Sequence, residues 1–106
     1  MVVETTPKEI LDLLGNANFT KCENMVYGEI EIDNTATSIL AANATTTGFI
    51  IYNNSDQTLF LGSDAVTIVN GMPVVAGASY SNDLWTGAIY GIVAAGTSDV
   101  RVEVFY

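Results

Sequence analysis

The chain has 106 residues, of which 49% are hydrophobic and 14% are charged, so it is long enough for one hydrophobic core but not for two. Twelve acidic residues against three basic ones give a formal net charge of -9. This excess disfavours direct binding to DNA or RNA, because such binding depends on cations that neutralise phosphates. The apolar runs are far shorter than the roughly 20 residues of a membrane-spanning helix, so we expect no membrane segment.

Residues 1–25 are predicted to form an N-terminal arm with one short helix, at about residues 6–15, followed by a connector. Thr6 is a suitable N-cap, Pro7 occupies the first helical position, and Glu9 completes a capping box. The apolar side chains of this helix fall on one side, and they are Ile10, Leu11 and Leu14. Because so short a helix is marginal alone in water, its apolar side needs a surface. Two surfaces remain open: an end of the protein's own core, or a neighbouring subunit.

Residues 26–106 are predicted to form a β-domain, because short apolar segments recur about every ten residues with turns between them. Two segments, 26–33 and 99–105, alternate apolar and polar residues as strands with one buried face do. The other predicted strands are 38–40, 49–52, 58–61, 66–69, a segment that returns after residue 71, 79–85 and 88–94. We therefore predict a mainly β fold, a small antiparallel sandwich or barrel of about seven or eight strands with one short N-terminal helix.

Turn sequences predict how these strands connect. Asn and Asp tolerate positive φ, so residues 53–56 (Asn-Asn-Ser-Asp) indicate a turn, which we expect to close a hairpin between 49–52 and 58–61. Asn70-Gly71 indicates a tight reversal. Pro73 follows it without a backbone donor, which favours an edge position for the returning strand.

The sequence predicts no catalytic machinery. It contains no His, so a Ser or Cys nucleophile would lack its usual base, and a single Cys cannot supply a zinc site. Four acidic residues that lie in predicted turns offer calcium ligands, although Asp also occurs in turns for backbone reasons: Asp56, Asp64, Asp83 and Asp99. We expect a non-enzymatic protein with no catalytic residue, metal or cofactor. Cys22 is expected to be a small buried residue.

Two groups of side chains are candidates for binding. The continuously apolar run 49–52 is typical of a strand that is buried on both faces or lies at a subunit contact. We therefore take the run 49–52, the C-terminal residues and the apolar side of the helix as candidate interface positions. These residues are Ile10, Leu11, Leu14, Phe49, Ile51, Phe105 and Tyr106. Trp85 with Tyr80 or Tyr90 forms a candidate glycan-stacking face; the alternative is that these rings belong to the core or to an interface.

The second half of the chain carries a recognisable series of motifs. They are Ile51-Tyr52-Asn53-Asn54, the reversal at 70–77 (Asn-Gly-Met-Pro-Val-Val-Ala-Gly) and a closing segment at 88–102 that contains Gly-Ile-Val-Ala-Ala-Gly-Thr-Ser-Asp-Val-Arg-Val. This series resembles the small β-rich virion proteins of tailed bacteriophages, in which the closing segment is a hairpin. The N-terminal half carries no such motif.

The resemblance implies a protein on the outer surface of the virion, made in the host cytoplasm without a secretory signal. The expected role is that of a capsid decoration or cement protein, which stabilises the head by contacts with the major capsid protein or other virion proteins. Such a protein is expected to assemble as a homo-oligomer, with a trimer favoured. Two alternatives remain: a fibre or adhesin module that binds a host-surface glycan, and a component of the neck or head-tail connector.

Overall fold

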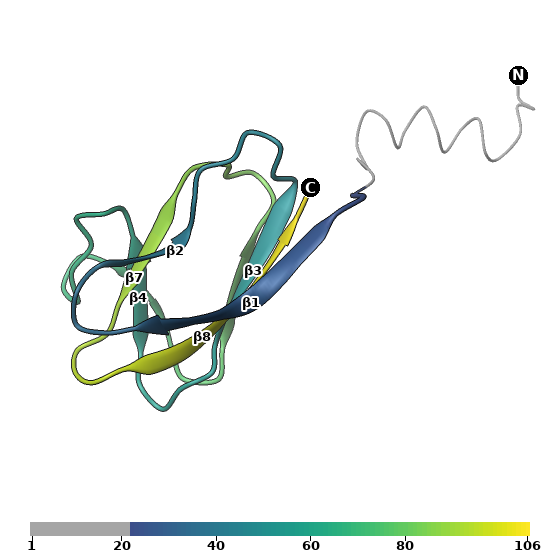
Figure 1. Ribbon diagram of the computed structural model, residues 1–106. Helices are drawn as coiled ribbons and strands as arrows, with labels where there is room; N and C mark the ends of the chain where they lie inside the picture. The colour runs from purple at the N-terminus through teal and green to yellow at the C-terminus, as the bar shows by residue number, and fades with distance from the viewer. Residues whose placement is uncertain (1–21) are drawn as a thin grey trace, which may run out of the picture.

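The computed structural model describes residues 22–106, and the helix predicted at about 6–15, with Ile10, Leu11 and Leu14, lies outside them. In the described part the chain forms eight strands and no helix (Figure 1). The strands are β1 (Met25–Ile32), β2 (Thr37–Leu40), β3 (Gly48–Asn53), β4 (Leu59–Gly62), β5 (Met72–Val74), β6 (Ser79–Asn82), β7 (Ile89–Ile92) and β8 (Ser98–Phe105). The prediction of a mainly β fold, a sandwich or barrel of about seven or eight strands, is therefore confirmed.

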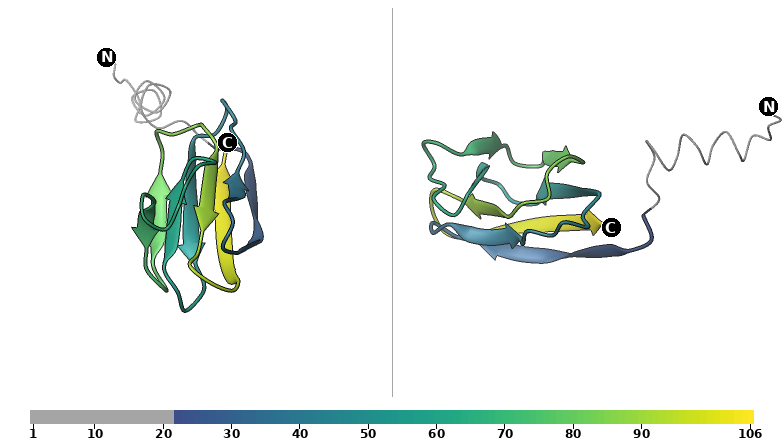
Figure 2. Two further views of the ribbon diagram at one scale, coloured as in Figure 1. Left: turned by 90° about the vertical axis from the view of Figure 1, so that its left-hand side faces the viewer. Right: turned by 90° about the horizontal axis from the view of Figure 1, so that it is seen from above.

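The strands form two four-stranded antiparallel sheets with the orders β1-β8-β3-β6 and β2-β7-β4-β5. Every connection crosses from one sheet to the other except the one between β4 and β5, which are paired neighbours. This strand order is that of a jelly roll. The right-hand view of Figure 2 shows the consequence for the edges: β1 runs along one side of the body, and β5 and β6 lie together on the opposite side.

The hydrophobic core lies between the two sheets, where alternate residues of each strand meet. In β8, Val100 and Val104 are buried while Arg101 points to solvent, which confirms the alternation predicted for 99–105. In β1 the alternation holds for the second half only, since Ile32 is fully buried whereas Val26 remains 51% exposed. The buried core is made up of Ile32, Ile39, Leu40, Phe49, Ile51, Leu59, Leu61, Val74, Ile89, Val93, Val100 and Val104.

The strand predicted at 66–69 is wrong, because these residues form turns inside the loop between β4 and β5. Local hydrogen bonds replace the ladder of a strand there. The side chain of Asn70 accepts a hydrogen bond from the Thr67 amide at 2.7 Å, and the hydroxyl of Thr67 accepts from the amides of Val69 and Asn70 at 3.2 Å. Side chains that satisfy the backbone locally favour turns over strands. The edge position predicted for the strand after Gly71 is confirmed, since β5 ends its sheet.

Two predicted hairpins are also wrong. β3 lies in a different sheet from β4, and β7 lies in a different sheet from β8. The turns at 53–56 and at 93–97 therefore carry the chain across the sandwich instead of reversing it within a sheet. A turn sequence specifies a change of direction, not the partner of the next strand. Cys22 is likewise exposed rather than buried, with its Sγ 2.8 Å from the Thr47 hydroxyl.

Candidate binding surfaces

The outer face of the β1-β8-β3-β6 sheet carries two rows of side chains set by the strand register. One row runs from Glu29 in β1 to Arg101 in β8 and Tyr52 in β3. The neighbouring row runs from Tyr27 through Glu103 to Ile50. Directly opposed residues on one face of a sheet are in contact distance, so tyrosine rings, carboxylates and one guanidinium share a small area.

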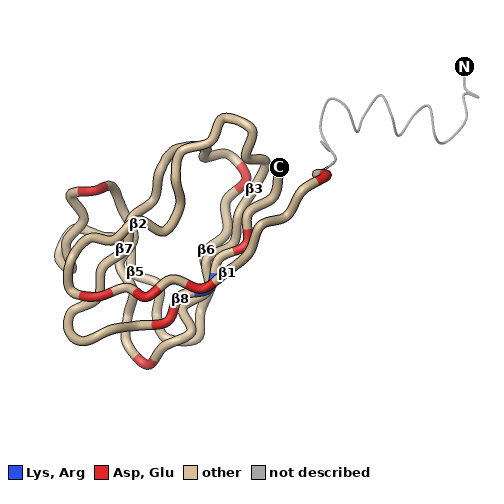
Figure 3. Tube along the Cα trace, in the orientation of Figure 1, with Lys and Arg blue, Asp and Glu red and all other residues tan. Residues whose placement is uncertain are grey.

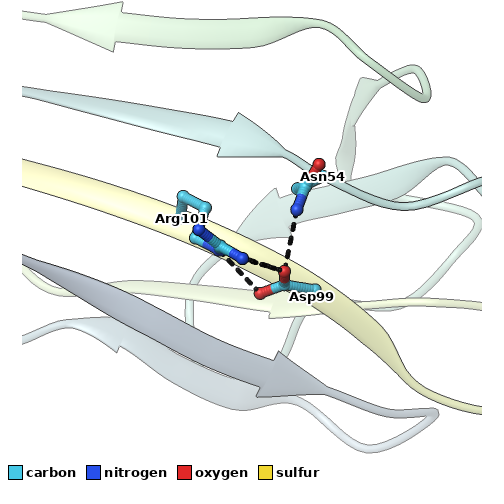
Figure 4. Close-up of polar contacts among 3 residues, drawn as sticks. All are labelled: Asn54, Asp99 and Arg101. Carbon is cyan, nitrogen blue, oxygen red and sulfur yellow. Dashed lines mark hydrogen bonds and ion pairs between the residues drawn. The ribbon is translucent and has the colours of Figure 1, made fainter.

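Arg101 is the only Lys or Arg among residues 22–106, and its position is fixed by its neighbours. Figure 4 shows its guanidinium beside Asp99, with Nε at 3.1 and 3.0 Å from the two carboxylate oxygens and Nη2 at 2.8 Å from Oδ2. Asn54 donates a third hydrogen bond to the same Oδ2 at 2.8 Å. The hydrogen bonds from Arg101 and then Asn54 lower the pKa of Asp99, and the carboxylate in turn raises the pKa of Arg101.

A shallow groove of about 420 Å³ lies over these two rows. Its lining includes Tyr27, Glu29, Ile50, Tyr52, Arg101 and Glu103. The hydroxyls of both tyrosines and the carboxylate of Glu103 make no hydrogen bond within the described part of the chain, so they are available to a ligand. Aromatic rings beside unpaired polar groups are the composition of a site for a small polar molecule with an apolar face, such as a sugar.

A second pocket, of about 410 Å³, opens at the opposite side of the sandwich, next to β5 and β6. It is lined by Leu61, Met72, Tyr80, Trp85, Ala88 and Ile89, among others. The loop between β6 and β7 fixes Trp85: Asn82 accepts hydrogen bonds from the amides of Leu84 and Trp85 at 2.7 and 2.9 Å, and the indole Nε1 donates to the Ala88 carbonyl at 3.3 Å.

The candidate glycan residues are therefore only partly brought together. Trp85 and Tyr80 line the same pocket, but Tyr90 does not. Ile89 points into the core, so its neighbour Tyr90 points out of the β2-β7-β4-β5 sheet, where Ser38 and Gly62 flank it. The three rings do not form one stacking face.

The candidate interface residues of β3 need a correction. Phe49 and Ile51 are 1% and 0% exposed, because they fill the protein's own core and leave no surface for a neighbour. The exposed apolar side chains of this strand are Ile50 and Tyr52 instead. Phe105 is partly buried, and Tyr106 packs against the core while its amide and carbonyl pair with the segment before β1.

Among residues 22–106, no group of three or more His, Cys, Asp or Glu side chains is placed to hold a metal ion. In the same range no helix is long and apolar enough to cross a membrane. Asp56, Asp64 and Asp83 lie apart in separate connections, which is the arrangement expected of turn residues.

The groove over β1, β8 and β3 was not predicted as a site. The signals were present in the sequence, since the alternation at 26–33 places Tyr27 outward and the run 49–52 must expose Ile50 and Tyr52 if Phe49 and Ile51 are inside. What the sequence could not supply is the pairing that sets β8 between β1 and β3 and so unites these residues.

The two-layer jelly roll places the chain in an architectural class that includes viral capsid and lectin domains. No protein-family model matches the sequence, and no curated protein matches it. Among solved structures, the chain is similar to the stem and receptor-binding domain of the spike protein P1 from bacteriophage PM2, with a TM-score of 0.58 and 18% sequence identity. The similar region covers 73% of this chain and 31% of that chain, which at this identity defines a shared fold.

Proposed function

We propose that this chain is a non-enzymatic structural protein of a bacteriophage virion and lies on the outer surface of the particle. The observation that carries the proposal is the shared jelly roll with a bacteriophage spike protein, at a TM-score of 0.58. The motifs at 70–77 and 88–102, which resemble those of phage virion proteins, support it independently of the fold. The described surface offers grooves and apolar patches for binding, as such a role requires.

For the role within the particle we propose capsid decoration. The described part of the chain carries nine acidic residues and one basic residue, so its surface complements a basic patch on a shell protein. The N-terminal arm is attached to the edge strand β1 and would supply a second contact through Ile10, Leu11 and Leu14. The major capsid protein is the partner that this arrangement suits.

Immunogold electron microscopy tests this proposal. An antibody raised against the purified chain is expected to label the surface of purified particles of the virus that encodes it, with the label distributed over the head. Label confined to the neck or tail would replace decoration by a connector or fibre role. A chain present in infected cells but absent from purified particles would overturn the virion proposal as a whole.

A receptor-binding role is the second candidate, and it is favoured by the unpaired polar groups of the groove between Tyr27 and Tyr52. The similar structure is itself described as a receptor-binding domain. A glycan array with the purified chain tests this role, with Tyr52→Ala expected to abolish any signal and Trp85→Ala to leave it intact. Loss of the signal in Trp85→Ala but not in Tyr52→Ala would move the glycan site to the pocket beside β6.

A further inference from the structure

Charge is distributed very unevenly along this chain. Asp83 is the only charged residue between Ala65 and Ser98, a segment that holds β5, β6 and β7. Seven of the nine acidic residues of the described part lie on β1, on β8 or in the loops beside them, whereas Asp64 and Asp83 lie elsewhere (Figure 3). Two copies of a molecule with a net charge of -9 repel each other over most of their surfaces. They can approach with fewer opposing carboxylates through the side that holds β5 and β6, where residues 66–97 contribute Asp83 alone; we call it the low-charge side.

The low-charge side also exposes large apolar side chains. Leu84 is 90% exposed, although leucine is usually buried. Its chain neighbour Trp85 is 52% exposed, and Met72, which lines the same pocket as Trp85, is 60% exposed. We call these three residues, with the pocket that Met72 and Trp85 line, the Leu84 surface. Exposed apolar side chains on a face with few charges are typical of a protein–protein contact.

The pocket of the Leu84 surface suits an aliphatic side chain better than a sugar. Its walls are mostly apolar, formed by residues such as Leu61, Met72 and Ile89. Its main polar groups already have partners: the indole N–H bonds to Ala88, and the Asn82 amide bonds to the Tyr80 hydroxyl at 3.0 Å. A sugar would find few unpaired hydrogen-bonding groups there, whereas an apolar side chain needs none.

We propose that the Leu84 surface is a contact between two copies of this chain, in which Leu84 of each copy enters the pocket of the other. Leu84 precedes Trp85 in the chain, and Trp85 forms part of the pocket wall. A projecting residue next to a cavity is the arrangement that a two-fold contact requires, because the same patch must offer both halves of the interaction. This proposal does not depend on the virion role.

Sedimentation velocity of the full chain tests the contact directly. The wild-type chain is expected to associate as its concentration rises from about 1 µM to about 1 mM, the range in which weak and moderate contacts appear. Leu84→Ser removes two buried leucines from a two-fold contact and should raise the dissociation constant by at least about 100-fold. The matched control is Tyr27→Ser, which removes a side chain that is 75% exposed on the acidic side and should leave association unchanged.

Two further measurements identify the contact. Trp85 is the only tryptophan, so its emission should shift to shorter wavelength on association in the wild-type chain and stay constant in Leu84→Ser. Raising the salt concentration from about 0.1 M to about 1 M shortens the screening length from about 10 Å to about 3 Å and should tighten the association, since it screens repulsion between acidic copies.

A chain that stays monomeric at every concentration overturns this inference and leaves the virion role intact. Association that survives Leu84→Ser, or that weakens as salt rises, also overturns it, because the contact would then lie elsewhere or rest on opposite charges. Circular dichroism of both variants confirms that they are folded, which the high exposure of Leu84 and Tyr27 leads us to expect.

Discussion

Asn53 is the polar residue on which the packing of this fold depends most. Its side chain is fully buried at the end of β3. The amide nitrogen donates to the carbonyl of Gln57 at 2.7 Å and to that of Val74 at 2.8 Å, and the amide oxygen accepts from the Ser55 hydroxyl at 2.6 Å. One side chain therefore joins the end of β3, the crossing loop after it and the end of β5 in the other sheet.

Asn53→Ala should cost a large fraction of the stability of the domain. It removes the hydrogen bonds that the Asn53 side chain donates to the buried carbonyl of Val74 and to the less buried carbonyl of Gln57, at about 1–3 kcal/mol in all. A small cavity adds to this cost. We expect a loss of about 3 kcal/mol, compared with the roughly 5–15 kcal/mol by which domains are stable. The thermal midpoint should fall by about 12 °C or more, at about 4 °C for each kcal/mol.

This loss of stability can be measured by urea and thermal unfolding, monitored through Trp85 emission and circular dichroism. The control is Asn54→Ala at the next residue, which is exposed and bonds through its amide nitrogen to Asp99 alone. Its cost should stay below about 1 kcal/mol, because an exposed group regains its hydrogen bond from water. Equal losses in the two variants, or a loss under about 1 kcal/mol in Asn53→Ala, would refute the role assigned to Asn53.

Three other changes test further contacts. The pKa of Asp99 is lowered in the folded state, so its ionised form adds stability that is complete above the unfolded-state pKa of about 3.9 and is lost as the pH falls through the lower folded-state pKa. The stability advantage of the wild-type chain over Asp99→Asn should therefore shrink between about pH 5 and pH 2. An advantage independent of pH would contradict this. Ser98 is 3% exposed, and its hydroxyl has no hydrogen-bond partner among the described residues. Ser98→Ala should therefore raise the free energy of unfolding by up to about 1 kcal/mol, as measured by urea unfolding. A clear loss of stability would reveal a partner. A Cβ at Gly87 would clash with Cζ2 of Trp85, so Gly87→Ala should displace the indole and change its emission. An unaltered spectrum would show that the ring does not lie on Gly87.

The strands with regular alternation could be predicted from the sequence, because the alternation is itself the physical cause of their position. Val100 and Val104 are apolar at every second residue, and only a strand with one face on the core places them together. Pro73 predicted the edge for a similar reason, since a residue without an N–H cannot serve a central strand. The apolar residues at 66–69 predict a strand, but the side chains of Thr67 and Asn70 hydrogen-bond to nearby backbone amides and favour a loop instead.

The topology could not be predicted in the same way. The turn after β3 contains the residues of a hairpin, yet the bonds of Asn53 to Gln57 and Val74 direct the chain into the other sheet. The bond to Val74 depends on β5, which lies about twenty residues further along the chain, so no local pattern contains it. The composition of the groove depends equally on β8 pairing with both β1 and β3, which are separated from it by most of the domain.

The charge distribution differs between the two edges of the sandwich, and it decides which edge can pair with another chain. A free edge strand invites pairing with another chain, and charged side chains are a common protection against it. Antiparallel pairing of two β1 edges would set Glu29 and Glu31 of one copy against acidic residues of the other, and such like-charge pairs are destabilising. The edge at β5 and β6 has no charged side chain on its strands and carries exposed apolar side chains such as Met72. The acidic side therefore remains open to a basic partner, and the low-charge side is left as the place where copies of the chain can meet.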